Sequence, residues 1–318
     1  MKYSLMSLTL GNLIKVTKPS FLQVSMAKRM GLAVEDPTLD QILEFMASKG
    51  FPAKKGTMTF EDCIKFAKET GFDGYDMMCF HLEGDGKEAK EILEKYGMTM
   101  SGSTIIVEFA NADTPEEFDK CFAYAKEHMD RAAAAGCKNV MLVPTTYTTK
   151  PGLSREQATL NMIAGFKACI EYAESVGLEP NAETLESSAV PLSSATEMQR
   201  YFDAFPQLKY SHDTGNLLVA NEDPVEMYEK FKDRVVRVHF KDMEYSEKRT
   251  PSMTRDGRFI RTTALGTGIV DFKEQMRLLK RDDFQGYVLL EGPVQHTDNV
   301  LEDAKKTLEY FRELEKTV

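Results

Sequence analysis

Four side chains that can bind a metal ion follow one another in the second half of the chain, namely Glu183, Asp213, His239 and Glu291. Each stands at or near the end of a short apolar run, which predicts a buried strand. Three carboxylates brought together would repel one another and be costly to bury without a cation between them. Predominantly oxygen donors with one imidazole suit Mn²⁺ better than a metal that prefers thiolate or only imidazole ligands, and Zn²⁺ is compatible with the same set. The pattern therefore predicts one divalent-metal site, although each residue taken alone is more often a solvated or core side chain.

The segments that carry these residues belong to a longer alternation of strand and helix patterns. Short apolar runs predict strands at 2–8, 73–78, 97–103, 139–145, 178–183, 208–213, 235–240 and 287–291. Amphipathic patterns predict helices at 59–70, 86–96, 114–135, 154–176, 194–204, 223–231, 271–280 and 298–316. Eight strands and eight helices in alternation predict an α/β protein with the (β/α)8 TIM barrel fold, in a single domain over residues 1–318. The C-terminal ends of parallel strands meet on one face of such a barrel, so the four residues are expected to converge there.

Two segments break the regular spacing. Residues 9–57 form a long insertion after the first strand, with an internal helix predicted from Pro37 to Ser48. Residues 243–264 follow the seventh strand and are rich in Arg and Thr. Both segments follow strand ends, so we expect them to lie over the catalytic face as a lid, a binding wall or an interface. A solvated decoration is the alternative for the insertion.

Composition excludes several classes of function. The formal net charge of -10 and the lack of a basic stripe argue against a nucleic-acid partner. No apolar stretch approaches the roughly 20 residues that cross a membrane. Five widely spaced cysteines without a CxxC pair favour a reducing compartment, and the N-terminus reads as the first strand, so we expect a cytoplasmic protein.

An ordered series of motifs resembles the xylose isomerase-like TIM barrel superfamily of sugar and sugar-phosphate isomerases and epimerases. The series comprises Ala182-Glu183, His212-Asp213-Thr214-Gly215-Asn216, Val238-His239-Phe240-Lys241-Asp242, Leu265-Gly266-Thr267-Gly268 and Leu289-Leu290-Glu291-Gly292. The resemblance implies that the four acid and imidazole residues hold one divalent metal, usually Mn²⁺, Mg²⁺ or Co²⁺. It further implies that Glu183 and Glu291 act as acid and base on a proton next to a sugar carbonyl, through an enediolate; pure metal ligation by both is the alternative.

Other polar residues are candidates for binding substrate. Asn216 stands where ketose epimerases commonly have a His, and Asp76 stands where many relatives have a Glu. His81 follows the second strand, and Lys241 shares the strand face of His239. The remaining candidates, Arg258 and Arg261, lie in the segment after the seventh strand. For each of them a structural or solvated role is the alternative, and His212 is expected to point away from the barrel axis.

Several functions are compatible with these features. Isomerisation or epimerisation of a keto-sugar comes first. The same proton abstraction on a 3-oxo-glycoside would instead release the aglycone by β-elimination, as in the catalytic subunit of bacterial C-glycoside deglycosidases, which pair with a small β-rich subunit. Endonuclease IV-like cleavage needs more metal ligands than five histidines readily supply, and a non-catalytic scaffold predicts a broken ligand set. We therefore expect a small sugar or glycoside as substrate, and either a homo-oligomer or a hetero-oligomer with a small β-rich subunit.

Overall fold

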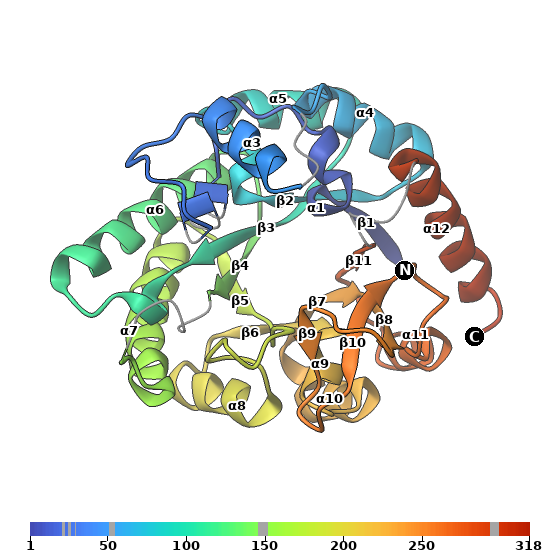
Figure 1. Ribbon diagram of the computed structural model, residues 1–318. Helices are drawn as coiled ribbons and strands as arrows, with labels where there is room; N and C mark the ends of the chain where they lie inside the picture. Colours follow the sequence, from blue (N-terminus) through green and yellow to red (C-terminus); the bar gives the residue numbers. More distant parts are fainter. Residues whose placement is uncertain (21–22, 25–26, 29, 51–54, 146–151, 293–298) are drawn as a thin grey trace.

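Eight parallel strands close into a barrel in the computed structural model, which describes residues 1–20, 23–24, 27–28, 30–50, 55–145, 152–292 and 299–318 (Figure 1). The order around the barrel is β1-β11-β7-β6-β5-β4-β3-β2. The strands are β1 (Lys2–Met6), β2 (Gly74–Met78), β3 (Met100–Val107), β4 (Asn139–Pro144), β5 (Glu179–Ala182), β6 (Lys209–Asp213), β7 (Val235–Phe240) and β11 (Tyr287–Leu290). The predicted TIM barrel is confirmed.

The helices that surround the barrel lie where the amphipathic patterns predict them. They are α4 (Phe60–Thr70), α5 (Lys87–Tyr96), α6 (Pro115–Ala134), α7 (Arg155–Ser175), α8 (Ala195–Ala204), α10 (Pro224–Phe231), α11 (Phe272–Arg281) and α12 (Val300–Glu315). Local chemistry sets their ends: Thr59 and Asp62 form a capping box at the start of α4, and Gly71 ends it with a φ of 96°. Among the described residues, no helix combines the length and apolar character that spanning a bilayer requires.

The third strand is the one whose predicted bounds, 97–103, are clearly displaced. Gly97 closes α5 in the left-handed conformation, and the backbone N–H of Met98 still bonds to Leu93 in that helix, so the strand begins only at Met100. It continues to Val107 because Ile105 and Val107 pack outward against helices. The alternate residue Ile106 belongs to a separate cluster with Met6, Met78 and Leu289 in the barrel interior.

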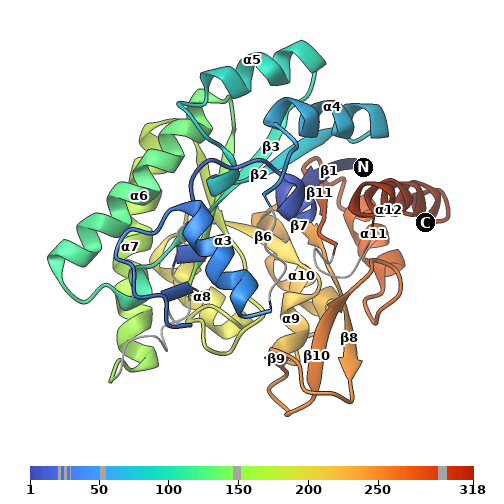
Figure 2. The same cartoon turned by 45° about the horizontal axis from the view of Figure 1, so that its top comes forward.

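The two long segments both leave the C-terminal ends of barrel strands, so they lie at one end of the barrel (Figure 2). The helix α1 (Ser7–Leu10) replaces the last two residues of the predicted first strand and runs into the insertion. The insertion then contains a 3-10 turn (Gly11–Leu13) and α3 (Leu39–Ser48), which confirms the predicted internal helix. Its residues 21–22, 25–26, 29 and 51–54, like residue 298 of the predicted last helix, lie outside the described residues. The segment after β7 is a three-stranded antiparallel sheet, β8 (Asp242–Ser246), β9 (Ser252–Met253) and β10 (Phe259–Thr263).

Candidate metal centre

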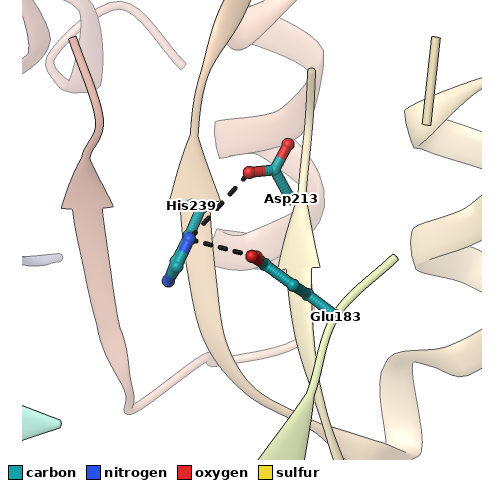
Figure 3. A group of neighbouring side chains, drawn as sticks. All are labelled: Glu183, Asp213 and His239. Atoms are coloured by element: carbon teal, nitrogen blue, oxygen red, sulfur yellow. Dashed lines mark ion pairs between the residues drawn. The ribbon is translucent and has the colours of Figure 1, made fainter. Parts of the chain in front are cut away.

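Side chains from three neighbouring strands point toward one another at the C-terminal end of the barrel (Figure 3). Glu183 directly follows β5, Asp213 ends β6 and His239 lies near the end of β7. The Nδ1 atom of His239 is 3.2 Å from Oε2 of Glu183 and 3.9 Å from Oδ2 of Asp213. One ligand atom from each residue lies within 4.8 Å of the others. All three residues are buried.

These ligand atoms lack the hydrogen bonds that burial normally demands. Oε2 of Glu183, Oδ2 of Asp213 and Nδ1 of His239 are buried and have no hydrogen-bond partner among the described residues. A buried polar atom left without a partner costs about 1–3 kcal/mol, and more when it is charged. A single cation bound by all three atoms would remove that cost. Two carboxylate oxygens and one imidazole nitrogen therefore fit a divalent metal ion.

Glu291, the fourth predicted ligand, lies beside this group and is shared with a lysine. Its Oε2 is 3.3 Å from Nδ1 of His239, and its Oε1 is 3.0 Å from Nζ of Lys241. Lys241 is also 2.9 Å from Oε2 of Glu186 in the loop after β5. Burial alone would lower the pKa of Lys241, but Glu186 and Glu291 outweigh it and raise the pKa well above its usual value. The ammonium group therefore stays charged beside Glu291.

The acids of the centre differ in their affinity for protons. Burial raises the pKa of Asp213 to about 8, with Glu183 and Glu291 acting in the same direction against Lys241. Burial would also raise the pKa of Glu291, but Lys241 and His239 lower it to about 2. The pKa of His239 rises to about 10 because the adjacent Glu183 outweighs burial. Without a cation, the cluster therefore keeps protons that a metal ion would displace.

Asp213 is oriented by the backbone that follows it. Its Oδ1 accepts the N–H groups of Gly215 at 2.8 Å and Asn216 at 2.6 Å, which leaves Oδ2 facing the centre. Gly215 has a packing reason to be glycine, since a Cβ there would lie 2.9 Å from Cγ of Lys241. The Asp-Thr-Gly-Asn motif thus orients the carboxylate of Asp213 and leaves room for the side chain of Lys241.

A model of the xylose isomerase-like TIM barrel family matches residues 44–314. The chain belongs to this family. Among curated proteins, inosose dehydratase from Geobacillus thermodenitrificans is 25% identical over 284 residues, which cover 82% of this chain and 92% of the relative. This relative is named as an enzyme, which supports an enzymatic function for this family member.

Solved structures share the fold at lower identity. The 3-keto-D-glucoside 4-epimerase from E. coli has a TM-score of 0.64 and 16% identity, covering 80% of this chain and 94% of the epimerase chain. The IOLI protein, whose structure contains a zinc atom, has a TM-score of 0.65 and 14% identity, covering 100% of this chain and 99% of its own. At these identities the likeness extends to the barrel architecture.

The structure of this family member places the other predicted substrate-binding residues in different surroundings. Asn216 is buried beside Asp213, and its side-chain Oδ1 has no partner among the described residues. His81 follows β2 at the same end of the barrel, with Nδ1 3.0 Å from the hydroxyl of Ser7, and burial lowers its pKa to about 4. Asp76 is fully buried inside the barrel, with Oδ2 2.7 Å from Nη2 of Arg237.

Arg261 lies in β10 of the antiparallel sheet, and Arg258 directly precedes that strand. Both side chains are more than half exposed and pair with acids of the same sheet segment, Arg258 with Asp256 at 2.8 Å and Arg261 with Glu244 at 2.5 Å. Their contact with substrate stays a prediction. His212 behaves as expected: its Nε2 bonds to Oε1 of Gln275 at 3.1 Å, on the outer side of the barrel.

Three residues near the centre were not among the sequence candidates: Arg237, Glu186 and Asp242. The period of two along a strand could have found Arg237, because residues 237 and 239 share one face of β7. No sequence pattern marked Glu186 as a site residue, because it lies in a loop whose path the sequence does not specify. Asp242 stands in a quoted motif, but its partners Gly266 and Gly268 lie more than twenty residues away.

Proposed function

We propose that this protein is a divalent-metal-dependent enzyme that removes the proton from the carbon next to the ketone of a polyhydroxylated substrate. The observation that carries the proposal is the set of three buried ligand atoms without hydrogen bonds, beside the Glu291 and Lys241 pair. The zinc atom of the IOLI structure supports a divalent metal in a barrel of this fold. Manganese is our expectation, on the donor chemistry.

The metal would be held by Glu183, Asp213 and His239, with Glu291 as the fourth ligand. When bound, a divalent ion polarises a ketone oxygen and stabilises the negative charge that develops there. Glu291 is kept as a carboxylate because its pKa is low, so it can accept the C–H proton. The electron pair of the broken C–H bond then forms the carbon–carbon double bond of the enediolate, and Lys241 places a positive charge nearby.

Two outcomes share this first step. Delivery of a proton to the opposite face by Glu183, which must first take that proton from solvent, inverts the carbon and gives epimerisation. Departure of a substituent from the next carbon with its bonding electron pair instead gives β-elimination. The curated relative is named a dehydratase and the E. coli structural neighbour an epimerase, so their names support the shared step rather than one outcome. Epimerisation or isomerisation of a keto-sugar is our first candidate.

β-Elimination from a 3-oxo-glycoside, as in C-glycoside deglycosidases, is the second candidate, and the apolar half of the barrel mouth favours it. The predicted ligands come from β5, β6, β7 and the end of β11, whereas Met6, Met78 and Ile106 come from β1, β2 and β3 on the other half. Leu8 and Phe80 pack on this cluster and are partly exposed. Such a wall suits an apolar leaving group better than a fully hydroxylated one.

The experiment follows C–H exchange with D₂O and product formation for free ketoses and for 3-oxo-glucosides, using metal-stripped protein with and without Mn²⁺. Metal-dependent exchange with either substrate class supports the proposal. Interconversion without release identifies an epimerase or isomerase, and aglycone release identifies a lyase. Lack of metal-dependent exchange in metal-loaded protein for every substrate contradicts the proposal. Addition of a small β-rich subunit tests the predicted hetero-oligomer.

A further inference from the structure

Glu186 lies in the loop after β5, and its carboxylate reaches the side chain of Lys241, which directly follows β7. Oε2 of Glu186 is 2.9 Å from Nζ of Lys241, and the same Nζ is 3.0 Å from Oε1 of Glu291. One ammonium group is therefore shared between a carboxylate of the candidate metal centre and a carboxylate of the loop. An ammonium group has three N–H donors, so these two acids leave a third donor for another acceptor.

The shared ammonium group lies beside the place that a substrate of the proposed reaction occupies. Oε2 of Glu291 is 3.3 Å from Nδ1 of His239, so one end of this carboxylate faces the predicted metal ligands. A substrate that gives a proton to Glu291 must contact the same carboxylate. The ammonium group of Lys241, on the other oxygen of Glu291, is then within reach of a substituent next to the reacting carbon.

Hydrogen bonds to the backbone fix both partners of the Glu186 and Lys241 pair. The hydroxyl of Thr214 donates to the backbone oxygen of Lys241 at 2.9 Å and accepts the backbone N–H of the same residue at 3.0 Å. The loop of Glu186 is closed on itself, because the N–H of Leu185 donates to the backbone oxygen of Leu192 at 2.9 Å. The end of β7 and the loop therefore hold the two charges in place.

The two members of the pair differ in exposure. The side chain of Lys241 is 9% exposed, whereas that of Glu186 is 39% exposed, although its Oε2 is buried. The lysine is therefore enclosed, and the glutamate keeps a surface that a ligand can contact beside the ammonium group.

A hydroxyl group matches this pair better than an anion does. A hydroxyl oxygen can accept from the ammonium group of Lys241 while its proton is donated to the carboxylate of Glu186. A phosphate or carboxylate group offers acceptors only, and it would lie near Glu186 and Glu291, which already share the one positive charge. A site that hydrogen-bonds a hydroxyl also rejects an analogue without it, because the buried polar groups are then left without a partner.

We propose that Glu186 is a specificity-determining residue that, together with Lys241, binds a hydroxyl group of the substrate next to the carbon that loses its proton. The proposal rests on the proposed function, because the reacting carbon is the one that Glu291 deprotonates. It identifies the substrate as a ketone with a free hydroxyl at this position. Lys241 alone would suit an anionic group there, and the carboxylate of Glu186 reverses that preference.

The test measures kcat/KM for C–H exchange in D₂O with Mn²⁺-loaded, full-length protein. The substrates are the free ketose or 3-oxo-glucoside that exchanges, and its monodeoxy derivatives. For the parent substrate, kcat/KM is expected to fall about 10-fold in Glu186→Gln, the loss that corresponds to one hydrogen bond to a charged group. For one monodeoxy derivative, the ratio of wild-type to variant kcat/KM should return to about 1, because the hydroxyl that Glu186 binds is already missing.

Two further variants separate charge from position. Glu186→Asp keeps the charge on a shorter side chain and is expected to recover part of the loss. Glu229→Gln is the matched control: Glu229 also pairs with a lysine, Lys232 at 3.2 Å, but it lies on α10 beside the start of β7, at the other end of the barrel. It should leave kcat/KM unchanged for every substrate.

Equal kcat/KM in the wild-type protein and Glu186→Gln overturns the proposal. A loss in Glu186→Gln that persists with every monodeoxy derivative also overturns it, because such a loss comes from the loop or from Lys241 rather than from a substrate hydroxyl. Wild-type protein without metal-dependent exchange on any substrate defeats the proposed function and this inference together. Wild-type exchange that does not depend on Glu186 defeats the inference alone.

Discussion

Lys241 and Asp242 are consecutive residues whose charged groups serve different parts of the protein. Nζ of Lys241 lies 3.0 Å from Oε1 of Glu291 in the candidate metal centre. Oδ2 of Asp242 accepts the backbone N–H groups of Gly266 and Gly268 at 3.0 and 2.8 Å. The motif after β7 therefore joins the site to the glycine-containing loop that follows the antiparallel sheet. A Cβ at Gly268 would lie 2.3 Å from Oδ1 of Asp242, which explains the glycine.

Replacement of Asp242 with Ala is expected to lower the free energy of unfolding by about 3 kcal/mol, because the variant removes the carboxylate that accepts part-buried hydrogen bonds from the backbone N–H groups of Gly266, Gly268 and Val270. Urea denaturation followed by circular dichroism measures the change. Asp256→Ala is the matched control, since Asp256 is exposed and its hydrogen bonds, to Thr254 and Arg258 of its own loop and to Asn221, lie away from the candidate metal centre. If both variants lower the free energy of unfolding by the same small amount, the hydrogen bonds of Asp242 do not stabilise the loop.

Glu183→Gln is expected to reduce the affinity for Mn²⁺ by at least about 100-fold, because an uncharged amide replaces a ligand oxygen. Glu186→Gln is the control: it makes the same substitution in the same loop, but Glu186 contacts Lys241 rather than the three ligand atoms. Calorimetric titration of both variants separates the two roles. Similar losses in both would argue that general negative charge, not ligation, attracts the ion.

The stabilisation that a metal gives should increase with pH. Asp213 and His239 have pKa values raised to about 8 and about 10, so the folded metal-free protein holds their protons more tightly than the unfolded chain does. These protons therefore stabilise the folded metal-free protein. The stabilisation is fully present below the pKa values of the two groups in the unfolded chain, and it is lost as pH rises through their pKa values in the folded protein. A bound metal replaces those protons. We expect the rise in Tm on adding Mn²⁺ to be larger near about pH 8.5 than near about pH 6, and a rise independent of pH would contradict the shifts.

Lys241→Met tests the base assigned to the reaction. Lys241 is the main group that lowers the pKa of Glu291, so its loss raises that pKa and moves the acid limb of kcat/KM for C–H exchange to higher pH. Lys241→Arg keeps the positive charge, so the acid limb of its pH profile should lie at nearly the same pH as in the wild-type protein. An unshifted limb in Lys241→Met would exclude Glu291 as the group that titrates.

Much of the barrel was predictable because its signals are local. Apolar runs and glycine stops located the strands, and Glu183, Asp213 and His239 were recognisable because each ends a strand whose direction the fold dictates. The displaced third strand shows the limit, since Gly97 belongs to the helix cap and its role depends on backbone conformation. The sheet of β8, β9 and β10 was missed because its short strands carry many charged residues and are stabilised by pairing with one another.

The sequence by itself determined the type of fold and the donor atoms available at one end of the barrel, because strand and helix periods and residue types are properties of short segments. Tertiary structure alone decided that Arg237 pairs with Asp76, which is 161 residues away, and that Glu291 is shared with Lys241. The closure of the barrel brings these charges within contact distance, and burial makes their partners obligatory. Which nitrogen of His239 faces the ligands is therefore a property of the closed barrel, not of the strand that carries it.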